Sequence, residues 1–453
     1  MARTAKKETV LTPEEKLAQA LVPEVEQPYH LPNNWCWVKL GSISFHISDG
    51  SHNPPKDSGK GVPLLSATNI HDRIIDFEQT ARWITDEEWM LENERTRIEV
   101  GDILLTIVAT IGRVAVVTTE QPFALQRSVA TIKPKINAQY LSYYLESPYV
   151  QTFMNTNAKG TAQKGFYLNS LENLFCVIPP LAEQQRIVAR IESLFAKLDE
   201  AKEKAQAVVD GFEDRKAAIL HKAFNGALTA EWRKDNGYCV DGWEDTILKH
   251  VLDVRDGTHD SPQYYDEGFP LVTSKNLKNG KITDKDLKLI SKEDYEKINE
   301  RSKVDIGDIL FAMIGTIGNP VVVEEEPRFA IKNVALFKNT GKINPYYVRY
   351  YLESKTVIDK MEREAKGSTQ KFVSLGYLRN FPIKMPTECE QQIIVKLLDR
   401  LFDAEIQAKE SAEQVIDQID TTEKSILARA FRGELGTNDP DDESAEKLLR
   451  RVL

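Results

Sequence analysis

The strongest constraint on this fold is a pair of long helical segments within one chain. The first, residues 183–226, contains no proline, and its only glycine before the end is Gly211. Its apolar or small residues recur at alternating steps of four and three, which predicts a helix that buries one narrow stripe against another helix. At roughly 1.5 Å per residue the rod would be about 65 Å long, so a small domain cannot hide the stripe.

The second segment, residues 390–433, supplies the partner helix. It keeps the same register at an offset of 207 positions, and both segments begin with Glu-Gln-Gln and end with Ala-Phe-X-Gly. Glu405 interrupts the apolar stripe of the second segment, at the position that matches Leu198 of the first. One stripe alone would indicate a generic coiled coil, but two matched stripes predict helices that pair within the chain. The residues expected at this interface are Ile187, Ile191, Leu194, Leu198, Val208, Phe212, Ile394, Leu398, Leu401, Val415 and Ile419.

The internal repeat continues outside the two helices, and repeats decide domain organisation. Asp49-Gly-Ser-His52 matches Asp256-Gly-Thr-His259, and further pairs of motifs keep an offset of 206 or 207. The chain therefore alternates globule, rod, globule, rod. The expected segments are a lead-in at 1–32, a first globule at 33–182, a first rod at 183–228, a linker at 229–242, a second globule at 243–388, a second rod at 389–435 and an acidic C-terminal tail at 436–453. Within the tail, residues 436–444 are expected to be loose, and residues 446–453 form a short amphipathic segment.

Each globule mixes strand and helix signals. In the first, residues 103–108 and 114–119 read as strands joined by a turn that contains Gly112. Residues 138–147 form an amphipathic pattern with Asn137 as the predicted N-cap. The predicted class is an α+β fold, with two similar α/β domains separated by two long helices.

Composition excludes several function classes. No apolar run approaches the roughly 20 residues of a membrane span, and the four cysteines are scattered without a C-x-x-C pair. No phosphate-binding loop or zinc-protease motif occurs, so we expect no metal site and a reduced, cytoplasmic protein. The net charge of −10 argues against a grip on nucleic acid by bulk electrostatics, and any DNA binding would be shared with a more basic partner.

Two duplicated motifs carry candidate chemistry. The Asp-Gly-X-His segments could hold a catalytic His–Asp pair, but we favour a turn in which Gly50 and Gly257 supply positive φ and the aspartate bonds nearby backbone. Gly160-Thr-Ala-Gln-Lys164 and Gly367-Ser-Thr-Gln-Lys371 combine backbone freedom with polar donors, which suits contacts to phosphate or base edges. An ordinary solvated loop is the alternative, and retention of Gln-Lys in both copies favours function.

One isolated motif is disfavoured. Asn53-Pro-Pro-Lys56 faintly resembles the motif with which amino-methyltransferases hold a target amine, but Lys56 replaces the aromatic residue that would stack on a flipped base. The second copy lacks the motif.

The order and duplication of these features resemble the DNA-specificity subunit of type I restriction-modification enzymes. The Trp35-Cys-Trp-Val-Lys-Leu-Gly41 opening, the Glu-Gln-Gln helix starts and the Ala-Phe-Arg-Gly-Glu-Leu435 ending belong to this resemblance, which covers nearly the whole chain. It implies two target recognition domains that each read half of a bipartite DNA target. It also implies two long helices that pair antiparallel as a spacer.

The same resemblance implies a non-catalytic subunit that binds no cofactor itself. Two methyltransferase subunits would dock on it and use S-adenosylmethionine to methylate adenine N6. Restriction subunits, where the system has them, would add an ATP- and Mg-dependent nuclease, and the complex would serve in phage defence.

If the two half-sites differ, residues that are identical at matched positions cannot distinguish them. Matched residues are then scaffold or phosphate contacts, and base contacts lie where the copies diverge, at 73–89 against 280–295 and at Arg113 against Asn319. Arg suits guanine, whereas Gln and Asn suit adenine. The residues expected to contact DNA are His52, Asn69, Arg113, Gln126, Arg127, Gln163, Lys164, His259, Lys275, Asn276, Asn319, Lys332, Asn333, Gln370 and Lys371.

Two alternatives from other classes stay open at this point. The first is a coiled-coil scaffold that organises protein partners without reading DNA. The second is an enzyme that uses the Asp-Gly-X-His segments, for which loss of activity after His52→Ala and His259→Ala would be required.

Overall fold

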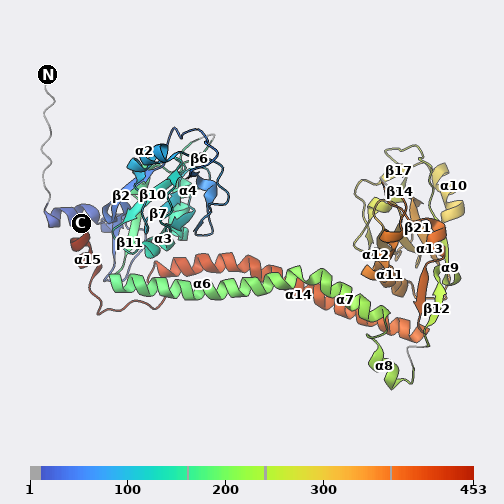
Figure 1. Ribbon diagram of the computed structural model, residues 1–453. Helices are drawn as coiled ribbons and strands as arrows, with labels where there is room; N and C mark the ends of the chain where they lie inside the picture. Colours follow the sequence, from blue (N-terminus) through green and yellow to red (C-terminus); the bar gives the residue numbers. More distant parts are fainter. Residues whose placement is uncertain (1–11, 161–162, 239–241, 368–369) are drawn as a thin grey trace. The chain divides into compact units, whose positions relative to one another are not determined.

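The computed structural model describes residues 12–160, 163–238, 242–367 and 370–453. The chain divides into two compact units, one made of residues 1–204 and 415–453 and the other of residues 205–414. Each unit combines one globule with the parts of the long helices that pack on it (Figure 1).

A four-stranded antiparallel sheet in the order β2-β10-β7-β8 forms the centre of the first globule. A three-stranded sheet, β6-β3-β9, and two strand pairs, β1-β11 and β4-β5, complete it. The strands are β1 Cys36–Lys39, β2 Ser44–Asp49, β3 Val62–Leu65, β4 Ile70–His71, β5 Ile74–Ile75, β6 Trp83–Ile84, β7 Ile103–Thr106, β8 Val114–Val116, β9 Ala124–Leu125, β10 Val129–Pro134 and β11 Phe175–Ile178.

The central strand β7 is buried on both faces, which explains its continuous apolar run. Ile103 and Leu105 belong to the core that the long helices also enter, whereas Leu104 belongs to a smaller core under the three-stranded sheet. Alternate side chains of one strand therefore join two layers. The turn predicted at Gly112 is confirmed.

The second globule repeats this topology. Its four-stranded sheet has the order β13-β21-β18-β19, beside β17-β14-β20, β12-β22 and β15-β16. The strands are β12 Glu244–Ile247, β13 Leu252–Asp256, β14 Phe269–Thr273, β15 Leu277–Lys278, β16 Lys281–Ile282, β17 Lys288–Ile290, β18 Ile309–Ala312, β19 Gly318–Val322, β20 Ala330–Lys332, β21 Val334–Asn339 and β22 Pro382–Met385.

Short helices cover the sheets, and two long helical segments run beside them. The predicted cap is present at Asn137, which accepts a hydrogen bond from the Tyr140 N–H (2.9 Å), and at the start of α1 Thr12 and Glu15 form a capping box. The helices are α1 Pro13–Ala20, α2 Asp86–Thr96, α3 Ala138–Glu146, α4 Pro148–Asn157, α5 Leu168–Glu172, α6 Leu181–Asp210, α7 Phe212–Phe224, α8 Ala230–Asp235, α9 Leu248–Val251, α10 Lys292–Ser302, α11 Pro345–Glu353, α12 Lys355–Glu364, α13 Leu375–Arg379, α14 Glu388–Ala430 and α15 Ala445–Val452.

The first rod is two helices rather than the single one predicted. Gly211 separates α6 from α7, yet its φ of −77° and ψ of −2° stay near helical values. The helical ladder also continues, since Gly211 N–H donates to Ala207 (3.1 Å) and Arg215 N–H donates to Gly211 (3.0 Å). The interruption is therefore one residue wide and does not redirect the segment sharply.

Most of the predicted helix interface is buried or half-buried, and Val415 is the exception. Its side chain is 41% exposed, whereas the next residue, Ile416, is half-buried, so the buried face has shifted by one position there. Glu405, which interrupts the stripe, accepts a hydrogen bond from Arg215 Nε (2.7 Å) and so pairs α14 with α7. The buried members are Ile187, Ile191, Ile394, Leu398 and Ile419, and the half-buried ones are Leu194, Leu198, Val208, Phe212 and Leu401.

The phenylalanine of each Ala-Phe-X-Gly ending anchors a long helix in a globule core. In the first unit, the ring of Phe431 lies edge-on to Tyr140 and Tyr144, with ring centroids 5.5 and 5.0 Å apart. In the second unit, Phe224 packs against Tyr347 at 5.4 Å. Each unit therefore joins the start of one long segment to the end of the other, which makes the two helices antiparallel within both units.

The glutamate of each Glu-Gln-Gln start is also buried. Glu183 accepts hydrogen bonds from Trp35 Nε1 (2.7 Å) and Asn438 Nδ2 (2.9 Å), and from Thr437 Oγ1 (3.3 Å). Burial raises the pKa of this carboxyl, and the three donors oppose that rise. The following residue, Gln184, accepts from Asn137 N–H (3.3 Å) and so fastens the helix start to the cap of α3.

The segment expected as a linker contains a helix and a buried ion pair. Arg233 on α8 donates to Glu390 Oε1 (2.6 Å), and their side chains are only 3% and 1% exposed. Thr229 and Trp243 donate to the same carboxylate, at 2.7 and 2.9 Å. Residues 229–238 thus cover the start of α14 as residues 437–438 cover the start of α6.

The acidic tail is packed rather than loose at 436–444, and the amphipathic segment expected at 446–453 forms α15. Leu448 and Leu449 on α15 are buried, and α15 lies beside α1 (Figure 1). Asp442 pairs with Arg186 of α6, and Lys16 donates to the backbone carbonyl of Leu453 (2.9 Å). The apolar residues of α15 recur on one face of the helix. Burial of that face outweighs the tendency of the preceding acidic residues to stay in solvent.

The buried pair makes Glu390 a test of how this unit is held together. Glu390→Ala should destabilise the protein by about 3–5 kcal/mol, because it leaves Arg233 buried without its counter-charge. The measurement is thermal unfolding of the full chain. Glu200→Ala is the control, because Glu200 pairs with Lys204 at an exposed position of α6. Equal melting temperatures for the two variants would contradict the role assigned to the buried pair.

Candidate nucleic-acid interface

Loops from distant parts of the chain meet at one edge of each four-stranded sheet. In the first globule, Ser51 N–H donates to Leu125 (2.7 Å) and Arg127 N–H donates to Ser51 (2.9 Å). Ile107 N–H donates to Ser128 (2.9 Å), which joins the loop after β7 to the same group. We name this group of loops, at 50–52, 107–113, 126–128, 159–160 and 163–165, the loop edge.

The Gln-Lys motifs lie on this edge in both units. Ala109 N–H donates to the carbonyl of Lys164 (3.1 Å), and Gly315 N–H donates to that of Lys371 (2.9 Å). The side chains of Gln163, Lys164, Gln370 and Lys371 are all exposed. Residues 161–162 and 368–369 of the motifs lie outside the described residues. The structure therefore brings the predicted donors to a surface where a ligand can reach them.

The Asp-Gly-X-His segments form real His–Asp contacts. His52 Nε2 lies 2.8 Å from Asp49, and His259 Nε2 lies 3.0 Å from Asp256. The aspartates are buried, and the histidine side chains are about half exposed, at 51% and 57%. The expectation that the aspartate bonds nearby backbone is replaced by contacts to side chains.

The glycines of these segments serve a different purpose from the one predicted. Neither Gly50 nor Gly257 is among the residues with positive φ. A Cβ at Gly50 would instead lie 2.1 Å from the carbonyl oxygen of Leu125, and one at Gly257 would lie 2.2 Å from that of Ile331. The close approach of two backbones, not the turn conformation, requires glycine at both positions.

Asn69 and Asn276 are corrections to the predicted DNA contacts. Both are nearly fully buried. Asn69 accepts from Ser66 N–H (2.9 Å) and donates to the Asp76 carbonyl (3.0 Å), and Asn276 makes the equivalent bonds to Thr273 (3.0 Å) and Thr283 (3.2 Å). Each amide fixes a one-turn helix against a hairpin, so both residues are scaffold.

The diverging residues of the first globule are available for contact. Arg113 and Arg127 are exposed, and Gln126 is half-buried. Arg113 also makes a long contact of 3.4 Å to the carbonyl of Ile70. All three remain candidates for base contacts.

In the second globule two of the diverging residues have a local explanation. Asn319 and Asn333 have positive φ, at 49° and 55°, a conformation that asparagine tolerates better than most residues. Asn333 Oδ1 also accepts a hydrogen bond from His259 Nδ1 (2.9 Å), and Lys332 Nζ donates to Ser261 (2.6 Å). Their identity alone is therefore weak support for base contacts, whereas Lys275 is fully available at the surface.

Sequence reasoning missed two arginines that join the His–Asp contacts. Arg95, on the last turn of α2, pairs with Asp49, and Arg301, on the last turn of α10, pairs with Asp256. A signal was present, because Asn93-Glu94-Arg95-Thr96 matches Asn299-Glu300-Arg301-Ser302 at an offset of 206.

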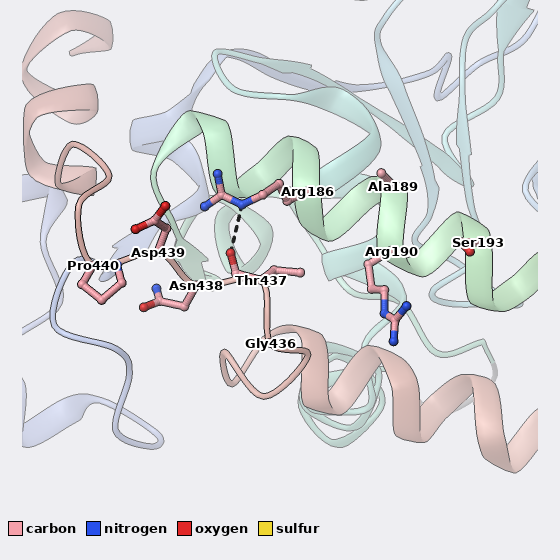
Figure 2. Close-up of a pocket in the computed structure, with 9 residues that line it drawn as sticks. All are labelled: Arg186, Ala189, Arg190, Ser193, Gly436, Thr437, Asn438, Asp439 and Pro440. Carbon is pink, nitrogen blue, oxygen red and sulfur yellow. Dashed lines mark hydrogen bonds between the residues drawn. The ribbon is translucent and has the colours of Figure 1, made fainter.

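A separate hollow of about 560 Å³ lies away from the loop edge, on the first unit. Arg186, Arg190 and Ser193 of α6 line one side, and residues 436–440 line the other (Figure 2). Arg186 Nε donates to the carbonyl of Thr437 (3.0 Å), so the hollow follows from the packing of the tail on α6.

Neither of two further features occurs in the part of the chain that the structure describes. No group of three or more His, Cys, Asp or Glu side chains there is placed to hold a metal ion. None of its helices is both long and apolar enough to cross a membrane.

Two related α/β globules, each with an exposed polar loop edge and each anchored to the same pair of helices, define a protein with two recognition domains. The family described as type I restriction modification DNA specificity domain matches residues 50–209 and again residues 240–418. The chain belongs to this family.

Individual relatives agree with that assignment. The type I restriction enzyme EcoBI specificity subunit of Escherichia coli is 31% identical over 218 residues, which is 47% of this chain and 46% of that subunit. The EcoKI specificity subunit of Escherichia coli K12 is 22% identical over 93% of this chain and 95% of that subunit. The solved HsdS subunit from Thermoanaerobacter tengcongensis has the same fold, with a TM-score of 0.62 and 19% identity over 90% of this chain and all of that one. The fold class predicted from the sequence is thereby confirmed.

The close backbone approach at the loop edge yields a prediction. Gly50→Ala should lower the melting temperature of the protein and displace the 126–128 loop, because the added Cβ overlaps the Leu125 carbonyl. Gly376→Ala is the control, since a Cβ there meets nothing within 4 Å. Thermal unfolding of both variants gives the comparison, and an unaffected Gly50→Ala protein would show that the backbones are not in tight contact.

Proposed function

We propose that each recognition domain contacts one half of a split double-stranded DNA target through its loop edge. The observation that carries the proposal is duplication with divergence. The frame of the edge, with its buried aspartate, its glycine and its Gln-Lys loop, is the same in both units, whereas Arg113 and Arg127 have no counterparts of the same type in the second. Matched residues that hold the loops, together with exposed residues that differ between the copies, suit two domains of one fold that recognise different half-sites.

We further propose that this chain is the non-catalytic subunit of a larger complex. Its two similar units offer equivalent docking positions for two copies of a methyltransferase, which would bind S-adenosylmethionine, flip an adenine and methylate its N6. Restriction subunits, where present, would bind ATP and Mg²⁺. The net charge of −10 supports DNA binding that is shared with the partner subunits, which would neutralise much of the phosphate charge.

The paired long helices are proposed as the element that sets half-site spacing. Each long segment is anchored at one end by a buried glutamate and at the other by a phenylalanine that packs on tyrosines, so its length is defined by packed contacts rather than by a flexible linker. Protein geometry of this kind is mirrored in the spacing of a bipartite site.

The base-contact assignment predicts a change at one half-site only. Arg113→Gln or Arg127→Gln should reduce discrimination at one base pair by about 1–3 kcal/mol, because a bidentate contact to guanine is lost. Sequencing of methylated adenines in the host genome, before and after substitution, measures it. Arg97→Gln, an exposed arginine at the end of α2, is the control. A wild-type target pattern in both variants would remove these arginines as base contacts.

The spacing assignment predicts a shift in target layout. Insertion of one heptad at matched positions of both long segments should keep their stripes in register and lengthen the pair by about 10 Å. At about 3.4 Å per base pair, the spacer between half-sites should grow by about three base pairs. Mapping of methylated sites reports the new spacer, and an unchanged spacer would contradict the proposal.

A scaffold without sequence recognition makes a different prediction. Gel shifts of the assembled complex on its mapped target and on random DNA, at rising salt, separate the two. A complex that loses all preference for its target at every salt concentration would favour the scaffold.

A further inference from the structure

We propose that Asp49 and Asp256 each hold an arginine and a histidine as a clamp for DNA backbone phosphate. The clamps consist of Asp49, His52 and Arg95 in the first unit and of Asp256, His259 and Arg301 in the second. This proposal rests on the proposed DNA-reading function and assigns a role within it to Arg95 and Arg301.

The geometry of the two clamps is the same. One oxygen of the aspartate contacts the histidine Nε2, at 2.8 Å in the first unit and 3.0 Å in the second. The other oxygen pairs with the arginine, which reaches it from the last turn of a helix, α2 or α10. Three residues from two separate elements thus recur in the same arrangement although the intervening segments have diverged.

Burial differs sharply between the aspartate and the arginine of each clamp. The side chains of Asp49 and Asp256 are 9% and 6% exposed, whereas those of Arg95 and Arg301 are 48% and 67% exposed. Both carboxylate oxygens of the buried aspartate are therefore occupied by the arginine and the histidine. Each arginine keeps N–H donors that face outward, and its rotamer is already fixed by the aspartate, which reduces the entropy cost of binding an anion. The histidine, held by the same aspartate, lines the site beside the arginine.

A hollow beside the second clamp shows where such an anion would lie. It has a volume of about 360 Å³ and is lined by His259 and Arg301, with Lys297, Thr258 and Ser261. Hydroxyl groups and cations are the donors that bind phosphate oxygens in nucleic-acid complexes. Asp260 and Asp294 also line it, so the hollow favours an anion presented at its rim over one enclosed in it.

A purely structural ion pair would explain part of this arrangement. It would fasten the end of α2 or α10 to the sheet, but it would need no histidine and no exposed arginine donors. Identity between the two units argues further for a backbone contact, because a residue that is the same in both cannot tell different half-sites apart.

Each clamp also adjoins a residue that does differ. Asn333 contacts His259 Nδ1 (2.9 Å), and the matched position in the first unit is Arg127, whose N–H donates to Ser51 beside His52. A phosphate bound at the clamp would therefore fix the distance between the DNA backbone and the diverging position 127 or 333.

The test is the salt dependence of DNA binding by the full chain assembled with its methyltransferase partner. Arg301→Gln should reduce the slope of log K against log salt by about 0.9, the value for one lost phosphate contact, and Arg95→Gln should do the same. Affinity should fall equally on target and unrelated DNA, and the methylated sequence should stay unchanged. Lys292→Gln is the matched control, because it removes the same charge at the opposite, exposed end of α10.

A second variant separates positioning from charge. Asp256→Asn removes a negative charge and makes the site more positive, so DNA binding would strengthen if net charge alone mattered. We expect weaker binding and a lower slope, because Arg301 is no longer held. Thermal unfolding of each variant confirms that it is folded.

Three outcomes would overturn the clamp. They are an unchanged slope in both arginine variants, an equal loss in Lys292→Gln, and an altered target sequence in Arg301→Gln, which would indicate a base contact. Failure of the proposed function looks different, because the wild-type complex itself would then show no preference for any sequence.

Discussion

The anchoring of each long helix in a globule core is the contact on which the rest of the structure depends. Phe431 and Phe224 each lie edge-on to tyrosines of a short helix, and each such pair contributes about 0.5–1.5 kcal/mol beyond the area it buries. Glu183 and Glu390 fix the opposite helix starts through tryptophan N–H donors. Because these four residues belong to matched motifs, the recurring Glu-Gln-Gln and Ala-Phe-X-Gly signatures mark anchoring points rather than features of a generic coiled coil.

The same anchoring explains why two dissimilar segments became ordered. In the second unit, Thr229 and Arg233 complete the hydrogen bonds of Glu390, whereas in the first unit Thr437 and Asn438 complete those of Glu183. A buried carboxylate without donors would cost several kcal/mol, so the chain must bring some polar segment to each helix start. The residues before α15 and those of α8 differ in sequence, but both supply hydrogen-bond donors to the buried glutamate at a helix start.

Periodic and local signals made much of the fold predictable. Heptad spacing and the cap at Asn137 depend on residues close together in sequence, and the repeat offset follows from direct comparison of the two copies. The errors share a different origin. The packed tail, the buried amides of Asn69 and Asn276, and the backbone contact at Gly50 depend on segments far away in sequence. No pattern around Gly50 could show that the carbonyl of Leu125 lies 2.1 Å from where its Cβ would be.

Divergence between the copies has two physical sources, and only one concerns DNA. Arg73 lies in a segment where the copies differ, yet it donates to Glu146 (2.7 Å) and Glu423 (3.2 Å) and lies over the ring of Phe195 (4.5 Å). The matched residue is Gly280, and in that unit Lys216 of α7 takes the equivalent place beside Glu353 (2.7 Å). The difference between Arg73 and Gly280 thus reflects different packing of the hairpin against the long helices in the two units. Divergence is an argument for a base contact only where the side chain lies exposed on the loop edge. Arg113 and Arg127 lie there, whereas Arg73 lies outside it and is held by Glu146 and Glu423.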